Sequence, residues 1–402
     1  MKVVICGAGI TGLALAQRLA VLGSEVVVLE KAAGPRTQGY MIDFFGPGYD
    51  AAEAMGLLPR LRELGYVLEE ARFVDADGRR RASLGFAQFA RTVGGRLLSI
   101  MRPDLESALR ESLPEEVDLR FSTSLTSVEN GADGVRVTLT DGEVLDADLL
   151  VGADGIHSAV RAVVFGEERN FLRHLGFHTA AWTFEDADVR TRVGDRFCLT
   201  DSVGRQLGLY GLRDGRVAAF AVHRTTDPAL PADTRSALRA EYGTLGWVAP
   251  DALAQCPPPD QVYYDHVAQI EMPAWHRDRV VLAGDACAAV SLLAGQGASL
   301  GIAGAYLLAD RLHHARTVAD GLESYERLWR PVMAEKQLTA RNGARWFLPR
   351  SAVELWGRRA VLALSRLPGL DHLVARSLAG KPTAVIADLR RRSGNAGVSA
   401  WR

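Results

Sequence analysis

A glycine-rich turn between two apolar runs opens the chain. Residues 2–6 (KVVIC) and 25–30 (EVVVLE) are rich in β-branched side chains, as short buried strands are. Residues 12–22 have the apolar period of a helix, and the sequence GAGITG at 7–12 connects the first run to that helix. This order predicts a strand–helix–strand unit. A chain that begins with such a unit is expected to build an α/β fold around a parallel sheet.

The three glycines of the turn have separate tasks in a phosphate-binding loop. Gly7 permits a tight turn, Gly9 lets a pyrophosphate approach the backbone, and Gly12 lets the helix pack closely on the strand. Free N–H groups at the helix N-terminus favour phosphate charge. Glu30 ends the second strand, where its carboxylate can accept hydrogen bonds from ribose hydroxyls and would repel a 2′-phosphate. The turn indicates FAD or NAD rather than NADP; the alternative is a glycine-rich turn without a ligand.

Composition narrows the class of protein. The 402 residues suffice for two or three packed units, and 48% hydrophobic with 24% charged residues is a globular composition. A net charge of −1 gives no field that attracts nucleic acid, and no run of about 18 apolar residues predicts a membrane span. The four cysteines are scattered without CxxC pairs, which argues against a disulfide scaffold or a metal site. We expect a cytoplasmic protein.

The rest of the chain alternates between two kinds of pattern. Residues 50–64 and 103–112 are predicted helices, and strand-like runs between 117 and 152 lead to another apolar strand. From about 172 to 270 the pattern changes to short alternating runs, which predict a separate antiparallel sheet. We therefore expect a discontinuous dinucleotide-binding domain (1–70, 100–171 and 271–345), a sheet domain (71–99 and 172–270) and a C-terminal helical segment with a tail (346–402).

Two further glycine–aspartate motifs follow apolar strands. Asp154-Gly155 lies in GADGIHSAVR at 152–161, and Gly284-Asp285 lies in RVVLAGDA at 279–286. Asp285 ends a buried strand, so its carboxylate needs donors such as cofactor hydroxyls; its alternative role is to cap a helix. Gly295 and Gly297 leave room for a flat ring, and the positive N-terminus of the next predicted helix would favour the anion formed when a flavin is reduced.

In this order and spacing, the three motifs resemble those of the flavoprotein aromatic hydroxylases typified by p-hydroxybenzoate hydroxylase. The tetracycline-inactivating monooxygenases and the hydroxylases of antibiotic biosynthesis are close types within that group, and the resemblance covers roughly residues 1–340. It implies a single-component monooxygenase with noncovalent FAD. NADPH or NADH reduces the flavin, O₂ forms a C4a-hydroperoxide, and one oxygen atom hydroxylates or epoxidises a hydrophobic, aromatic or polyketide-like small molecule. The implied architecture is a Rossmann-like FAD-binding βαβ domain interleaved with an antiparallel-sheet substrate domain, plus C-terminal helices.

The resemblance assigns cofactor contacts along the whole FAD-binding half. The ADP half of FAD would be held by Gly7, Gly9, Ile10, Thr11, Gly12, Glu30 and Lys31. Further contacts to the cofactor would come from Arg36, Gly39, Asp43, Arg102, Leu125, Asp154 and Gly155. The ribityl chain and the flavin ring would meet Gly284, Asp285, Gly295, Gln296, Gly297, Ala298 and Ser299. Arg36 has the alternative of being a solvated surface side chain.

The third motif departs from the family pattern. Ala288 replaces the usual histidine, and Ser291 and Leu292 stand where a proline is expected. Ser299 and Gly304 replace an asparagine and an aspartate. The glycines and Asp285 that the cofactor needs are retained, so FAD remains the predicted cofactor. Leu292 and Leu293 predict an apolar wall of the substrate cleft.

Three polar or aromatic residues of the middle sheet are candidate substrate contacts. Trp182, Tyr210 and His223 lie on apparent strands, and a tyrosine or histidine there could deprotonate a phenol. For each of them the alternative is a packed or solvent-tipped sheet residue, and no catalytic base is assigned.

Two other functions fit the same fold. One is an FAD-dependent dehydrogenase, reductase or halogenase, although the Trp-x-Trp-x-Ile-Pro segment of halogenases is absent. The other is a catalytically silent flavin-binding partner protein, which only the altered third motif supports.

Overall fold

The predicted α/β architecture is confirmed by a computed structural model, which describes residues 1–291, 295–364, 385–386 and 388–389. Its first layer is a six-stranded sheet in the order β17-β18-β11-β1-β2-β7, parallel except for β17. These strands are β1 (Lys2–Cys6), β2 (Glu25–Leu29), β7 (Asp118–Arg120), β11 (Leu149–Gly152), β17 (His276–Arg277) and β18 (Val280–Leu282). The central strands are buried on both faces, which explains their unbroken apolar sequences.

A seven-stranded sheet forms the second half of the molecule, in the order β16-β12-β15-β14-β13-β4-β5. Its strands are β4 (Glu70–Val74), β5 (Arg80–Gly85), β12 (Leu172–Phe184), β13 (Phe197–Ser202), β14 (Arg205–Gly211), β15 (Val217–Arg224) and β16 (Tyr263–Ile270). All neighbours are antiparallel except β13 and β4. Two segments far apart in the sequence therefore build one sheet.

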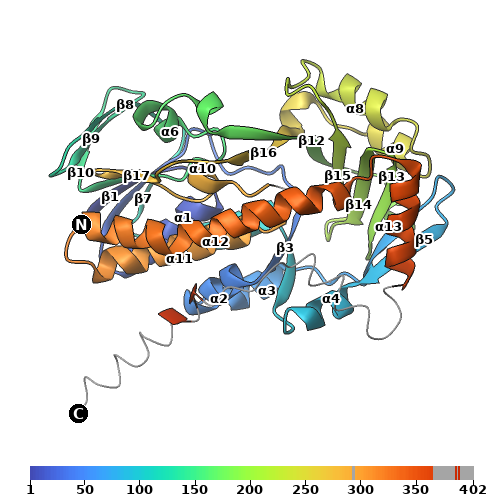
Figure 1. The fold of residues 1–402 in the computed structure, drawn as a ribbon, viewed down its shortest axis with the longest axis horizontal. Helices are drawn as coiled ribbons and strands as arrows, with labels where there is room; N and C mark the ends of the chain where they lie inside the picture. The colour runs from blue at the N-terminus through green and yellow to red at the C-terminus, as the bar shows by residue number, and fades with distance from the viewer. Residues whose placement is uncertain (292–294, 365–384, 387, 390–402) are drawn as a thin grey trace, which may run out of the picture.

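Two smaller sheets and several helices complete the FAD-binding half. β3 (Met41–Phe45) pairs with β6 (Leu97–Met101), and β8 (Leu125–Asn130), β9 (Val135–Leu139) and β10 (Val144–Ala147) form a meander. The helices of the FAD-binding half are α1 (Ile10–Val21), α2 (Pro47–Ala54), α3 (Leu58–Leu64), α5 (Arg102–Glu111), α6 (Ala159–Val164), α10 (Asp285–Ala288) and α11 (Gly297–His314). Figure 1 shows α12 (Val318–Phe347) running from the six-stranded half toward the seven-stranded sheet.

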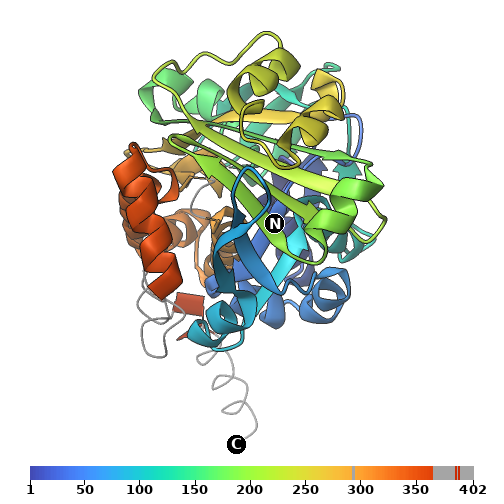
Figure 2. The ribbon, with the colours of Figure 1, turned by 90° about the vertical axis from the view of Figure 1, so that its right-hand side faces the viewer.

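Helices also flank the seven-stranded sheet. They are α4 (Phe86–Thr92), α7 (Ala187–Val193), α8 (Thr234–Tyr242), α9 (Ala249–Ala254) and α13 (Ala352–Leu364), with α13 at one side of the sheet in Figure 2. A second hydrophobic core lies between this sheet and α7, α8 and α9. α7, α8 and α9 thus cover one face of the sheet. Within the described part of the chain, the helices are too short or too polar to cross a membrane.

One predicted helix is two helices in the structure. The expected helix over 50–64 divides into α2 and α3 at Gly56, whose φ is 73°. A left-handed glycine cannot continue a right-handed helix, so the chain turns there.

Candidate active site

The three glycine–aspartate motifs meet because of strand order. β1, β11 and β18 are parallel neighbours, so the segments that follow their carboxyl ends share one edge of the sheet. That edge carries the turn at Gly7, the loop at Asp154 and the segment at Asp285. In open α/β sheets, ligands bind at this edge.

Close packing explains the glycines of the first turn. Gly7 has a φ of +107°, and a Cβ atom there would lie 2.5 Å from the carbonyl oxygen of Ala153. A Cβ on Gly12 would lie 1.9 Å from the carbonyl oxygen of Gly7. A Cβ on Gly284 would lie 2.4 Å from the Thr11 hydroxyl oxygen. The three motifs therefore interlock, and larger side chains at these glycines would push them apart.

Glu30 holds the glycine turn in place. Its side chain accepts a hydrogen bond from the Ala8 N–H at 2.9 Å and another from the Ala32 N–H at 2.9 Å. The residue is 8% exposed and lines the cavity beside the turn. Each carboxylate oxygen has a second lone pair, so the group can still accept from a ligand hydroxyl.

One continuous cavity of about 780 Å³ runs from the glycine turn to the seven-stranded sheet. At the turn its wall comes from β1, α1 and the loop that follows β2. At the sheet its wall is apolar and aromatic, and includes Phe73, Phe86, Phe197, Leu199, Phe220, Val267 and Phe347. The cavity thus has a polar end suited to a dinucleotide and an apolar end suited to a second molecule.

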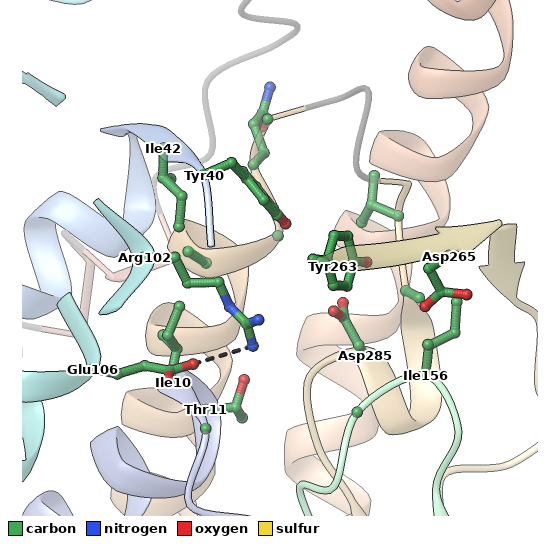
Figure 3. A pocket seen from close by; sticks show the side chains of 18 of the residues that line it. Ile10, Thr11, Tyr40, Ile42, Arg102, Glu106, Ile156, Tyr263, Asp265 and Asp285 are labelled. Atoms are coloured by element: carbon green, nitrogen blue, oxygen red, sulfur yellow. Dashed lines mark ion pairs between the residues drawn. The ribbon is translucent and has the colours of Figure 1, made fainter. Parts of the chain in front are cut away.

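A charged pair lies between the two ends. Arg102, at the start of α5, forms an ion pair with Glu106 at 3.1 Å, and Asp285 lies on the opposite wall (Figure 3). Burial opposes the Arg102 charge, but Glu106 and other acidic groups outweigh it, so the pKa of Arg102 is raised. Burial raises the pKa of Asp285, and Arg102 offsets part of that rise. A buried carboxyl facing a cavity is a ready partner for ligand hydroxyls.

Asp154 offers a second acceptor to the cavity. Its Oδ2 accepts from the N–H groups of Ala159 (2.7 Å) and Val160 (3.1 Å) at the start of α6. Its Oδ1 is buried and has no hydrogen-bond partner among the described residues. Burial raises the pKa of this carboxyl. An orphaned buried oxygen beside a ligand-sized cavity indicates that a bound molecule completes the site.

The two-stranded antiparallel sheet of β3 and β6 lies beside the cavity. The Ser99 hydroxyl donates to Asp43 Oδ1 at 2.6 Å, while burial raises the pKa of Asp43. The Tyr210 hydroxyl oxygen accepts a hydrogen bond from the Met41 N–H. Tyr210 therefore ties the substrate sheet to the FAD-binding half, and its O–H proton remains available to a ligand.

Most residues assigned from the sequence line this cavity. They are Gly7, Gly9, Ile10, Thr11, Glu30, Lys31, Arg36, Asp43, Arg102, Leu125, Asp154, Gly155, Asp285, Gly295, Gln296, Gly297, Ala298 and Tyr210. Leu292 and Leu293 lie outside the described residues.

Four of the residues assigned to the cofactor have packing roles in the structure. Gly12 and Gly284 make room within the interlocked motifs, and Gly39 makes room for the Pro103 ring, 2.8 Å from where its Cβ would be. Ser299 is 2% exposed; its hydroxyl accepts from the Gly48 N–H at 3.0 Å and donates to the Phe45 carbonyl. These residues do not line the cavity, and their contact with FAD stays a prediction.

The expected substrate contacts at Trp182 and His223 need correction. Strand residues alternate between faces, and both side chains point to the face covered by α8 and α9. The Trp182 indole N–H donates to the Ala252 carbonyl at 3.3 Å, and His223 Nδ1 lies 2.9 Å from the Tyr242 hydroxyl. Tyr210, by contrast, faces the cavity.

Sequence reasoning missed the aromatic residues in the middle of the cavity. Tyr40 packs against Phe220, with ring centroids 5.5 Å apart, and against Tyr263 at 5.9 Å. All three line the cavity, and Figure 3 shows Tyr40 and Tyr263 extending from separate segments. Burial raises the pKa of Tyr40 to about 12, so its hydroxyl remains a donor at neutral pH. Residues 263, 265 and 267 of the segment YYDHV alternate along one strand and so share one face. This spacing was the signal that could have identified Tyr263.

Comparisons with known proteins agree with this geometry. The family model described as "FAD binding domain" matches residues 1–339. A flavin-dependent monooxygenase of Legionella longbeachae is 30% identical over 320 residues, covering 78% of this chain and 80% of the relative. The 2-heptyl-3-hydroxy-4(1H)-quinolone synthase of Pseudomonas aeruginosa is 31% identical over 320 residues, covering 77% of this chain and 80% of the relative.

The fold also matches a solved structure. The crystal structure of tetracycline destructase Tet(55) superposes with a TM-score of 0.79 at 24% identity, covering 95% of this chain and 98% of that chain. That likeness concerns the fold. From the family match over residues 1–339 and the interlocked glycine motifs, the chain belongs to the FAD-binding-domain family of flavin-dependent monooxygenases.

Proposed function

We propose that this monooxygenase uses NADPH or NADH and O₂ to hydroxylate a hydrophobic aromatic or polyketide-like molecule in the sheet end of its cavity. Bound FAD supplies the redox and oxygen chemistry, and the protein supplies binding, orientation and exclusion of water. The observation that carries the proposal is the cavity itself, which joins a dinucleotide cradle to an apolar, aromatic chamber.

The FAD-binding half would hold the cofactor in three places. The turn at Gly7–Gly9 and the start of α1 would receive the pyrophosphate, and Glu30 would accept from the ribose. Asp285 and Asp154 would accept from further cofactor hydroxyls or amines. Gly297 is the first residue of α11 and lines the cavity. The N-terminus of this helix would favour the negative charge on a reduced flavin ring.

The sheet end would bind the substrate by ring packing. A Cβ on Gly208 would lie 2.4 Å from the Phe197 ring, so this glycine lets the ring lie flat against β14. Phe197 and Phe220 both line the chamber. Aromatic rings favour offset or edge-to-face contact with a flat ligand, and they exclude water from the reacting centre.

Two polar groups would orient the substrate in this apolar chamber. Gln206 and Tyr210 lie on the same face of β14, four residues apart, and both line the cavity. Burial raises the pKa of Tyr210, so it remains a hydroxyl donor at neutral pH. The relatives support an aromatic substrate: one is named for a hydroxylated quinolone, and the fold match is named for tetracycline.

Substrate-stimulated consumption of NADPH or NADH tests the proposal. A panel of tetracycline, alkylquinolones and planar phenols is screened for compounds that accelerate oxidation of either reductant. With an active compound, Phe220→Ala should raise KM about tenfold or more, because a buried aromatic side chain contributes ~1.5–3 kcal/mol. Trp182→Phe is the matched control on the opposite face of the sheet and should leave KM unchanged. Equal KM values for Phe220→Ala and the parent enzyme would place the substrate elsewhere.

We also propose that the protein works in the cytoplasm. All four cysteines are free and buried, which suits a reducing compartment. A cell fractionation with activity measured in each fraction tests this location.

A further inference from the structure

Three potential metal ligands meet where the two halves of the molecule touch. His157 lies in the loop between β11 and α6, and Asp265 and His266 lie on β16, the edge strand of the seven-stranded sheet. One ligand atom from each residue falls within 4.8 Å of the others. His157 and Asp265 also line the cavity. The cluster therefore joins the FAD-binding loop to the substrate sheet.

Local backbone contacts explain how two neighbouring strand residues face one point. Successive side chains of a strand normally point to opposite faces. Asp265 Oδ1 accepts a hydrogen bond from the His266 N–H at 2.8 Å, which turns the carboxylate along the strand toward its neighbour. Because β16 pairs only with β12 in its sheet, its other side is open to the His157 loop. His157 Nε2 reaches Asp265 at 3.4 Å.

His266 has unused ligand atoms. Both of its ring nitrogens are buried, and neither has a hydrogen-bond partner among the residues that the structure describes. Its ring meets the His157 ring edge-on, with centroids 5.5 Å apart. Buried polar atoms without partners are rare, and their presence calls for an unseen partner. A ring nitrogen beside a carboxylate and a second imidazole can supply a metal bond.

A carboxylate behind His157 orients its ring. Glu168 accepts from His157 Nδ1 at 3.0 Å, which leaves Nε2 directed at Asp265. The buried guanidinium of Arg161 donates to the other oxygen of Glu168 at 2.8 Å and fixes that carboxylate. Histidines that bind metals commonly donate their second ring N–H to a carboxylate in this way. The cluster thus has both ligands and an orienting shell.

We propose that His157, Asp265 and His266 form a binding site for a divalent transition-metal ion of the Zn²⁺ or Cu²⁺ class. Two imidazoles and one carboxylate suit these ions rather than Ca²⁺ or Mg²⁺, which prefer oxygen ligands. Three protein ligands leave a coordination position for water or a small ligand. The His157 side chain is 42% exposed, so an ion can enter from solvent. A bound ion cross-links the loop at Gly155 to β16 and stabilises the contact between the two halves.

Metal binding to the FAD-loaded enzyme tests this site. After removal of metals with EDTA, calorimetric titration with ZnCl₂ should show one saturable site, and Zn²⁺ should raise Tm. With Cu²⁺, electron paramagnetic resonance should show coupling to two imidazole nitrogens. His157→Ala and His266→Ala should each abolish this site. Glu168→Gln, which keeps the shape of the side chain and its bond to Arg161, should weaken Zn²⁺ binding about 10–100-fold.

The controls separate the site from adventitious binding. The exposed neighbours His313 and His314, with ring centroids 5.0 Å apart, are the obvious surface competitor. His313→Ala should leave the Zn²⁺ titration unchanged. FAD content and circular dichroism confirm that each variant is folded. Absence of a saturable site in the parent enzyme would overturn the proposal. Unchanged Zn²⁺ affinity in folded His157→Ala and His266→Ala would overturn it as well. The cluster would then only join the His157 loop to β16 by hydrogen bonds.

Discussion

At the scale of single residues, the shape of the cofactor cradle depends on glycines, because a Cβ atom at these positions would not fit. A methyl group on Gly12 would collide with the Gly7 carbonyl, and backbone atoms cannot move aside as a flexible side chain can. Most of the other glycines are not needed to avoid a collision with backbone atoms. Gly357, within α13, is an example, because no atom lies within 4 Å of where its Cβ would be. The same substitution should therefore have opposite effects at the two positions.

Gly12→Ala should lower stability and FAD content together. Overpacking a closely packed site costs about 1–3 kcal/mol, and the displaced turn would no longer fit a pyrophosphate. Gly357→Ala should instead gain roughly 0.5–1 kcal/mol, because alanine loses less conformational freedom in a helix. Urea unfolding and flavin absorbance measure both effects. A Gly12→Ala protein with parental stability and a full complement of FAD would disprove the packing argument.

Glu30→Ala should weaken FAD binding by about 10–100-fold. The change removes the acceptor for the Ala8 and Ala32 N–H groups, and hydrogen bonds to a charged group contribute ~1.5–3 kcal/mol each. Glu25→Ala, at the exposed start of the same strand, is the control and should bind FAD normally. Fluorescence titration of the apoprotein with FAD gives both affinities. Equal affinities for the two variants would contradict the role assigned to Glu30.

At the scale of elements, the sequence predicted which strands and helices exist better than which way they face. The β1–α1–β2 unit is strongly patterned and was predicted within a few residues of its observed bounds. β14 and β15 carry apolar or aromatic residues on both faces, because one face borders the cavity and the other packs on α8 and α9. β12 has a similar run of apolar residues, but none of them lines the cavity. Alternation alone therefore could not separate Tyr210 from Trp182. The packing role of Ser299 could not be predicted, because its partner in α2 is about 250 residues away in the sequence.

The packing of β15 on α8 should make stability depend on pH. Burial lowers the pKa of His223 from 6.5 to about 4, and its neighbours are His178 of β12, Arg205 of β14 and Tyr242 of α8. The unfolded chain therefore binds a proton more readily. The stability contributed by neutral His223 is complete above pH 6.5 and is lost as the pH falls toward 4. His178, with a pKa also lowered to about 4 mainly by burial, adds to the effect.

His223→Asn should make this dependence less steep, because asparagine does not titrate and its side-chain oxygen can still accept from the Tyr242 hydroxyl. The measurement is the urea midpoint between pH 4 and pH 7 for both proteins. His313→Ala, at the exposed end of α11, is the control and should keep the parental slope. A variant slope identical to the parental one would show that His223 is not the titrating group.

At the scale of the whole molecule, function follows from the seam between the two halves. The FAD-binding half supplies the glycine cradle. The seven-stranded sheet, with Phe86 of α4 and Phe347 of α12, supplies the aromatic chamber. The two are joined by the Tyr210–Met41 hydrogen bond and by the tilted ring contact of Tyr40 with Phe220. The motifs near 7, 154 and 285 predicted the first half of the site because they follow parallel strands. The second half depends on tertiary contacts between distant segments, and the alternation in YYDHV at 263–267 signals only part of it.

Oxygen labelling tests the central claim most directly. The purified FAD-loaded enzyme is supplied with NADPH or NADH, a compound that accelerates reductant oxidation, and ¹⁸O₂, and the product is analysed by mass spectrometry. A monooxygenase places one labelled oxygen atom in the product and forms none without O₂. Product that carries no label, or that forms equally fast under argon, would contradict the account and establish the dehydrogenase alternative.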